Sequence, residues 1–282
     1  MAISLAEEFG GEIISADSVQ VFKGFDIGSA KITEDEKRNI PHFGIDILDP
    51  NEEFSVFDYI QYTKQKIDEI TDRGHLPIIV GGTGLYVKAM TEGYDFGGKG
   101  KESSFRESLK QEAQEKGLEN LYERLKTLSP ERASKISQND EKRIIRSLEI
   151  LALGSTPSKD EVDIDAKIFA LDMPRDILYE RINKRVDIML QNGLIKEVEN
   201  LLEQSVKKDC QPMRAIGYKE VVAFLENTLT KEEMSELIKK NSRNYAKRQL
   251  TFCRGIKNIV FVDVLDREKG KEILKKEIKE WL

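Results

Sequence analysis

A carboxylate near the start of the chain could act as a base or as a cation ligand. Residues 12–15 (EIIS) read as a buried strand, and the chain then continues into Asp17, Ser18, Val19 and Gln20. Open parallel α/β sheets bind ligands at the carboxyl ends of their strands, so Asp17 is predicted to face a ligand crevice. There it could accept a proton from a nucleophile. The alternative is that Asp17 only caps the turn that follows the strand.

A glycine-rich turn follows a second apolar segment. Residues 76–80 (LPIIV) are typical of a strand covered on both faces, and Gly81, Gly82, Thr83 and Gly84 follow directly. Glycines let a phosphate or another backbone approach closely, and the N-terminus of the next helix favours anions. Because the spacing matches neither GxGxxG nor GxxxxGK(S/T), a purely structural tight turn is the alternative.

Three cations share one broad face of a predicted helix at 176–203, namely Arg181, Lys184 and Arg185. Such a group can bind a diphosphate, with arginine forming bidentate hydrogen bonds and lysine acting as a point charge. The opposite face is apolar and predicted to pack on the core: Ile182, Val186, Met189 and Leu190. The alternative for the cations is surface pairing with Glu180 and Asp187.

Residues 237–262 contain no Asp or Glu and hold a series of cations, namely Lys239, Lys240, Arg243, Lys247, Arg248, Arg254 and Lys257. Tyr245 and Phe252 lie between them, and unpaired bases stack on such aromatic side chains. This stretch is therefore predicted to contact nucleic acid. Lys142, Arg143 and Arg146 form a second basic group, with pairing to Glu141 and Glu149 as its alternative.

Composition limits the class of protein. The chain has 282 residues and a net charge of −6, which argues against general coating of nucleic acid or an anionic membrane. No apolar run is long enough to span a membrane, and the N-terminal residues lack the basic region of a signal peptide. The two cysteines have no metal-site spacing. We therefore expect a cytoplasmic monomer that makes no membrane contact.

The elements that must position these residues alternate between strand and helix in the first third of the chain. We expect helices at 2–9 and 55–73 and strands at 12–15, 44–48 and 76–80, followed by purely helical patterning from 102 to 153. Strands reappear at 167–171 and 258–264, and a loop is expected at 154–163. This order predicts an α/β core of residues 1–98 and 161–282 that is interrupted by a helical insertion at 99–160.

Segments in this order resemble the bacterial tRNA dimethylallyltransferase (tRNA isopentenyltransferase) family. They are residues 12–31, 41–50 (PHFGIDILDP), 74–88 (GHLPIIVGGTGLYVK), 139–149 (NDEKRIIRSLE), 171–190, 213–220 (MRAIGYKE) and 241–254 (NSRNYAKRQLTFCR). Each segment alone is a weak signal, but together they span nearly the whole chain. The resemblance implies a P-loop NTPase-like parallel sheet core with an inserted all-helical domain that binds the tRNA anticodon stem-loop.

The resemblance also implies a reaction that uses Mg²⁺. The family transfers a dimethylallyl group from dimethylallyl diphosphate to N6 of the adenosine 3′ of the anticodon. Asp17 matches the residue that accepts the amine proton, and Arg185 matches the arginine that binds the diphosphate, with Lys184 and Arg181 beside it. The target base must leave the stack to react. The positions expected to contact tRNA are Asp17, Ser18, Val19, Gln20, Thr83, Lys142, Arg143, Ile144, Ile145, Arg146, Arg214, Gly217, Lys219, Lys247 and Arg248.

The sequence departs from the family at its phosphate-binding loop. The family carries GxxxxGK(S/T) just before the helix that ends here with AISLAEEF, and no such motif is present. We therefore expect that the first strand, the phosphate loop and the metal site associated with it are omitted from this chain. The connection at 154–163 is also shorter than in the family. Phe22 stands where the family usually has Tyr, and Cys253 where a large aromatic is usual.

Three other functions remain open at this point. An adenylate prenyltransferase would act on a free nucleotide, although it would need neither the helical insertion nor the basic stretch at 237–262. A P-loop small-molecule kinase would suit the sheet and would bind ATP, but no second nucleotide motif supports it. An RNA-binding protein without activity is the third alternative.

Overall fold

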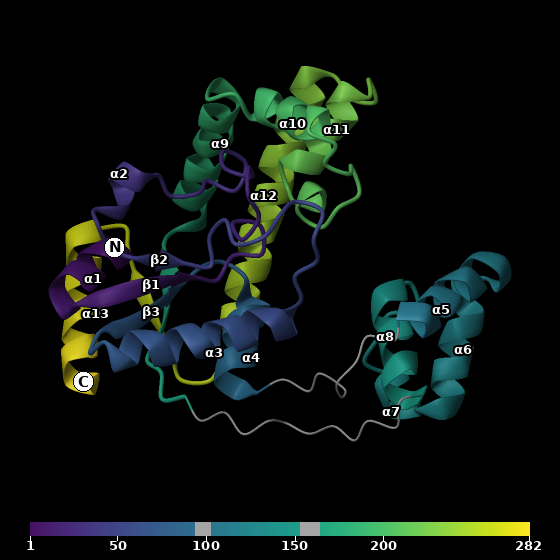
Figure 1. The fold of residues 1–282 in the computed structure, drawn as a ribbon, viewed down its shortest axis with the longest axis horizontal. Coiled ribbons are helices and arrows are strands. Elements are labelled where there is room, and N and C mark those ends of the chain that lie inside the picture. The colour runs from purple at the N-terminus through teal and green to yellow at the C-terminus, as the bar shows by residue number, and fades with distance from the viewer. Residues whose placement is uncertain (94–102, 153–163) are drawn as a thin grey trace. The chain divides into compact units, whose positions relative to one another are not determined.

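The computed structural model describes residues 1–93, 103–152 and 164–282 (Figure 1). The chain divides into two compact units, one formed by Met1–Glu92 and Asp163–Leu282 and the other by Gly93–Val162. The insertion boundaries expected at 98/99 and 160/161, and the loop expected at 154–163, lie outside the described residues.

The first unit contains a parallel sheet of order β2-β1-β3. Helix α1 (Ala2–Phe9) ends at Gly10, whose φ of 61° lets the chain turn into β1 (Gly11–Ser15). Strand β1 is central and buried, and it pairs with β2 (His42–Phe43) and along its full length with β3 (Leu76–Val80). The carboxyl ends of β1 and β3 therefore lie side by side, with Ser15 opposite Val80. The expected α/β core with parallel strands is confirmed.

The second strand lies earlier than the sequence predicts. Gly44 and Asp46 have φ values of 76° and 54°, in the left-handed region where an extended strand cannot continue. Pairing is therefore confined to His42–Phe43, and of the expected strand at 44–48 only Leu48 forms an isolated parallel bridge, with Phe22. Strand β3 is also less covered than expected, since Val80 is 38% exposed.

Two longer helices precede and follow β3 in sequence, α3 (Val56–Asp72) and α4 (Gly84–Glu92). Helix α3 begins with a capping box formed by Ser55 and Asp58, which satisfies its first amide groups. The rings of Tyr59 and Tyr86 stack with centroids 3.9 Å apart, so α3 and α4 pack together. The short helix α2 (Glu34–Lys37) lies between β1 and β2 in sequence.

A second parallel pair, β4 (Ile168–Asp172) and β5 (Ile259–Asp263), lies in the same unit. Its apolar side chains share one core with α1, β3 and the C-terminal helix α13 (Arg267–Trp281). The buried members of this core are Leu5, Val262, Val264, Leu274 and Ile278. The late return of a strand is therefore confirmed.

The long helix predicted at 176–203 is two helices. Helix α9 (Arg175–Gln191) and helix α10 (Leu194–Glu203) are separated by Gly193, whose φ is 99°. After the short turn η1 (Pro212–Arg214) and helix α11 (Tyr218–Leu225), helix α12 (Lys231–Cys253) packs against α9 in the opposite direction. Arg243 donates to Asn183 over 2.6 Å, and Lys239 pairs with Asp187 over 2.8 Å.

The second unit is helical over its described residues: α5 (Ser103–Lys116), α6 (Leu118–Leu128), α7 (Pro130–Ala133) and α8 (Glu141–Ala152). Asp140 accepts from the Arg143 amide over 3.2 Å and so caps the start of α8. The unit has its own apolar core, whose largest members are Leu109, Leu121, Leu125, Ile144 and Leu148. Leu128 does not join this core and is 56% exposed.

In the described part of the chain, no helix combines the length and the apolar character needed to cross a membrane.

Candidate functional site

Asp17 lies directly after the carboxyl end of β1, where it folds the chain into a tight turn. Its Oδ1 accepts hydrogen bonds from the amides of Val19 and Gln20, over 2.8 and 3.3 Å. This is the capping role that the sequence left open. Across residues 1–93, 103–152 and 164–282, no hydrogen bond reaches the second oxygen, Oδ2. Capping therefore fixes one oxygen and leaves the other able to accept a proton.

The glycine turn packs directly against this carboxylate turn. A side chain at Gly81 would overlap the backbone of Ala16, so only glycine lets the ends of β1 and β3 approach this closely. The Ser18 amide donates to Oγ1 of Thr83 over 3.2 Å. The structural interpretation of these glycines is therefore correct for Gly81, and Thr83 lies beside the Asp17 turn.

Helix α12, from a distant part of the chain, joins the Asp17 turn and the glycine turn to form one cluster. Tyr245 and Gln249, one helical turn apart, both donate to the carbonyl of Gly82, over 3.1 and 2.8 Å. Burial raises the pKa of the Tyr245 phenol, and the nearby carboxylate of Asp17 raises this pKa further. Burial likewise raises the pKa of Tyr86, with smaller contributions from Tyr59 and Asp17. The cluster thus joins an acid to two phenols that remain protonated.

Sequence reasoning singled out Tyr245 only as a stacking residue. It assigned no role to Gln249 or Tyr86, although both lie in segments that carry the family resemblance. The spacing of Tyr245 and Gln249, four residues apart on a helix with a basic surface, is the one signal that could have indicated a shared contact.

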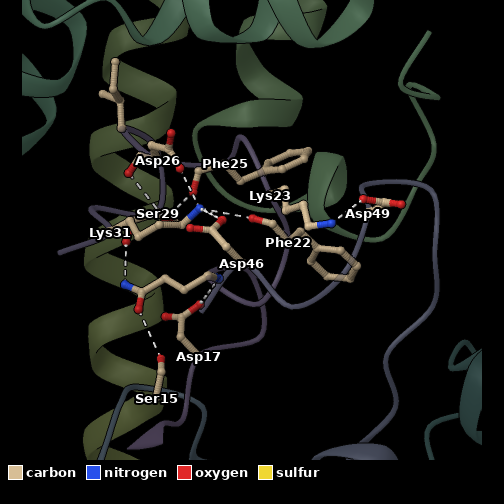
Figure 2. A network of polar contacts seen from close by, with 12 residues as sticks. Ser15, Asp17, Phe22, Lys23, Phe25, Asp26, Ser29, Lys31, Asp46 and Asp49 are labelled. Carbon is tan, nitrogen blue, oxygen red and sulfur yellow. Dashed lines mark hydrogen bonds and ion pairs between the residues drawn. The ribbon is translucent and has the colours of Figure 1, made fainter. Parts of the chain in front are cut away.

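Gln20 is more enclosed than the predicted RNA contact suggests. Its Nε2 donates to the carbonyl of Ser29 over 3.2 Å, and its Oε1 accepts from the Ser15 hydroxyl over 3.1 Å. Figure 2 shows this segment together with Lys31, whose ammonium contacts Asp26 and Asp46. The side chain of Gln20 therefore fastens the turn to the loop that follows it.

The three cations of α9 are exposed, as a ligand-binding role would require. Within the described ranges, no ion pair involves Arg181, Lys184 or Arg185, and Asp187 pairs with Lys239 of α12 instead. The expected pairing with Glu180 and Asp187 is therefore not what the structure shows.

Within the described part of the chain, no hydrogen bond or ion pair joins Arg185 to the turn formed by Asp17. Asn183, two positions before Arg185 on α9, accepts a hydrogen bond from Arg243 of α12. The two sites are linked through α12, because Arg243 contacts α9 and Tyr245 contacts the glycine turn.

Two basic side chains of α12 line a cavity of about 600 Å³ in the same unit. It is lined by Lys88, Asn244, Lys247, Arg248, Thr251, Phe252 and Gly255. The Lys88 ammonium lies 5.8 Å from the centroid of the Phe252 ring, and the Arg248 guanidinium lies 5.7 Å from that of Tyr245. Cations and aromatic faces are thus already combined where the sequence predicts RNA contact.

The second basic group differs from its prediction. Ile144 and Ile145 are 0% and 3% exposed within the core of the second unit, so the prediction that they contact RNA is wrong for these side chains. Arg146 pairs with the buried Glu149 over 2.8 Å, which confirms the alternative for this residue. Lys142 is exposed, and Arg143 lies 3.4 Å from the carboxylate of Asp140.

The remaining predicted contacts lie around the start of α11. Arg214 and Lys219 are exposed, with carboxylates at 4.0 and 3.8 Å. Gly217 has a φ of 98° and is buried, so it shapes the turn and offers no side chain of its own. Its amide is satisfied by Glu220 over 2.7 Å.

Among the residues that the structure describes, no group of three His, Cys, Asp or Glu side chains could hold a metal ion. Asp17 is a single carboxylate in the cluster. These residues therefore do not form a resident metal site.

Comparisons with known proteins agree with one another. The family model described as IPP transferase matches residues 20–256. The chain is 45% identical over 285 residues to the tRNA dimethylallyltransferase of Bacillus subtilis, covering 99% of this chain and 90% of that one. A tRNA isopentenylpyrophosphate transferase of Bacillus halodurans superposes with a TM-score of 0.73 at 40% identity, covering 99% of this chain and 90% of that one. A eukaryotic dimethylallyltransferase described as acting on tRNA gives a TM-score of 0.79 at 28% identity, covering 95% and 71%.

Proposed function

The chain belongs to the IPP transferase family, and we propose that it transfers a dimethylallyl group from dimethylallyl diphosphate to N6 of an adenosine in tRNA. The acceptor is the adenosine 3′ of the anticodon. The observation that carries this proposal is the Oδ2 of Asp17, which accepts no hydrogen bond from the described residues and lies near the end of β1. Helix α12, which is rich in cations, contacts the neighbouring glycine turn. The names of the relatives support the substrate class.

Asp17 accepts the proton in this reaction. The N6 nitrogen forms a bond to the allylic carbon, the bond from that carbon to the diphosphate oxygen breaks, and the displaced amine proton moves to Oδ2. An adenine amine is a weak nucleophile because its lone pair is conjugated with the ring. A base within hydrogen-bond reach removes the charge that would otherwise build up on nitrogen.

The cations of α9 stabilise the diphosphate as it leaves. Arg185 offers a bidentate guanidinium, with Arg181 and Lys184 on the same face of the helix. A donor placed where negative charge develops lowers the barrier by about 3 kcal/mol. The exposure of these three side chains and their freedom from ion pairs among the described residues support this role.

The RNA binds through several exposed basic segments. Lys247 and Arg248 line the cavity beside Phe252, and a base that leaves the stack of the loop could rest on such a ring. We also assign RNA contacts to the Asp17–Gln20 turn, to Thr83 and to Arg214 and Lys219. In the helical unit, Lys142 and Arg143 contact the anticodon stem-loop of the RNA.

Mg²⁺ commonly binds through substrate phosphates with one or two protein carboxylates. We therefore propose that Mg²⁺ enters with the diphosphate of the donor. We also propose that the protein acts in the cytoplasm and as a monomer.

Transfer of a labelled dimethylallyl group to unmodified tRNA tests the proposal. Asp17→Asn should lower turnover by at least about 100-fold, because the amide cannot take the proton, while tRNA binding persists. Asp49→Asn is the matched control, since this carboxylate is exposed and pairs with Lys23 at the surface. Near-normal turnover of Asp17→Asn would refute the role, and transfer to adenosine monophosphate in preference to tRNA would refute the acceptor.

A further inference from the structure

Glu197 of α10 binds a run of three backbone amides in the loop that follows the Asp17 turn. Its Oε2 accepts from the amides of Asp26 and Ile27, over 3.1 and 2.7 Å, and its Oε1 accepts from the amide of Gly28 over 3.2 Å. These partners lie about 170 positions away in sequence, as the separation of 170 for Ile27 shows. A carboxylate that accepts several amides in this way is strongly held, because each bond is charge-assisted.

The same carboxylate is also bonded to the segment that begins α11. The hydroxyl of Tyr218 donates to Oε1 of Glu197 over 2.8 Å. Tyr218 is fully buried, and its ring packs on Phe25 with centroids 4.8 Å apart. A side chain at Gly28 would collide with this ring, so only glycine fits at position 28. Glu197 thus joins the loop at 26–28 to the segment that contains Arg214 and Lys219.

From this loop the contacts continue to the Asp17 turn. The carbonyl of Ser29 accepts from Nε2 of Gln20, and the backbone amide of Gln20 donates to Oδ1 of Asp17. Lys31 holds the other side of the loop through Asp26, Asp46 and the carbonyl of Phe22, and its side chain is only 6% exposed (Figure 2). The position of the Asp17 turn therefore depends on where the loop is held.

We propose that Glu197 is a positioning residue that fixes the Asp17–Gln20 turn relative to the Arg214–Lys219 segment. The proposal rests on the proposed function, in which both segments contact the same RNA. Glu197 touches neither the RNA nor the reacting atoms. It acts by keeping two binding segments in register, so that the RNA does not have to order them when it binds.

Glu197→Gln is the sharpest variant because it keeps the shape of the side chain. One amide oxygen can still accept from Asp26 and Ile27, but the NH₂ group faces the amide of Gly28 and cannot accept from it. Glu203→Gln is the matched control on the same helix. The Glu203 side chain is 71% exposed, and its carboxylate lies 3.7 Å from the Lys196 ammonium in a surface ion pair. Tyr218→Phe is a second variant, which removes one hydrogen bond and retains the ring.

Hydrogen exchange and RNA binding give the two primary readouts. In Glu197→Gln, amides of residues 26–28 should exchange at least about 10-fold faster. Affinity for a synthetic anticodon stem-loop RNA should fall by about 10- to 100-fold, the scale of a misplaced binding group. In turnover, KM for RNA should rise while KM for dimethylallyl diphosphate stays constant. Tyr218→Phe should show the same pattern with about a 10-fold loss at most.

Unchanged RNA affinity in a folded Glu197→Gln protein would overturn the inference. An equal rise of both KM values would overturn it as well, because that result indicates general destabilisation. These outcomes are distinct from failure of the proposed function, which would appear as absence of transfer by the wild-type protein. Exchange and RNA binding are measured without turnover and test Glu197 in either case.

Discussion

The absence of a side chain at Gly81 lets the chain after β3 lie directly against the chain after β1. A Cβ at this position would meet the carbonyl carbon and oxygen of Ala16, which are backbone atoms and cannot rotate away. At Gly82 the nearest atom would be Nε2 of Gln249, at the far end of a flexible side chain. The two glycines are adjacent in sequence and yet constrained by very different neighbours.

We therefore expect Gly81→Ala to destabilise the protein by about 1–3 kcal/mol, the usual cost of forcing atoms into a packed site. Gly82→Ala should cost less, because Gln249 can move aside at the loss of one hydrogen bond. The free energy of unfolding in urea measures both. Equal losses for the two variants would contradict the assigned contacts.

Residue chemistry could be predicted only where neighbours in sequence are also neighbours in space. Asp17 was found because a carboxylate after a short apolar run marks a strand end, and its capping bonds reach only Val19 and Gln20. Glu197 gave no signal, because its partners Ile27 and Gly28 lie about 170 positions away. The burial of Ile144 and Ile145 was also missed, since a motif match says nothing about which side chains a helix turns inward.

Helix α12 both contacts other elements of its unit and presents exposed cations. Lys239 and Arg243 contact α9 from one side of the helix, and Tyr245 and Gln249 contact the glycine turn from another. The exposed cations beyond them lie around the cavity with Phe252. The lack of acidic residues, which predicted an RNA surface, therefore also reflects contacts to Asp187 and Asn183 within the protein.

Removing the cavity cations should reveal their share of RNA binding. Lys247→Ala combined with Arg248→Ala should weaken tRNA binding and reduce the slope of log K against log salt by about 1.4 to 1.8. The reason is that each cation releases a counterion from the RNA when it binds a phosphate. Binding titrations at several salt concentrations measure this slope.

The control removes the same charge from another helix. Lys269→Ala combined with Lys276→Ala takes two exposed lysines from α13 and should leave the slope unchanged. A similar fall in both double variants would mean that net charge alone governs binding.

Most of the strands, and helices α1 and α3, were predicted close to their observed bounds, and the two main errors share one physical cause. The strand expected at 44–48 fails at Gly44 and Asp46, and the helix expected at 176–203 breaks at Gly193. All three residues have a positive φ, which ends either kind of regular backbone. Apolar periodicity continued through these positions and gave no warning, because it reports burial and not dihedral angles.

At the scale of the whole molecule, the two compact units depend on separate cores. One core of the first unit is formed by apolar side chains from α1, β5 and α13, including Leu5 and Val262. The helical unit is centred on Leu109, Leu121 and Leu125, with Glu149 buried between Arg106 and Arg146. Since hydrophobic stabilisation is local to the surface that each core buries, a core substitution should act mainly on its own unit.

Leu121→Ala tests this independence. Leu121 is fully buried, so its truncation should cost about 2–5 kcal/mol and fall on the helical unit. Hydrogen exchange should accelerate in residues 104–152 and remain unchanged in β1, β3 and β5. Val262→Ala, at 1% exposure in the other core, should give the reverse pattern. Loss of protection in both units from either substitution would show that they unfold as one, and a defect in RNA binding by Leu121→Ala could then no longer be assigned to the helical unit.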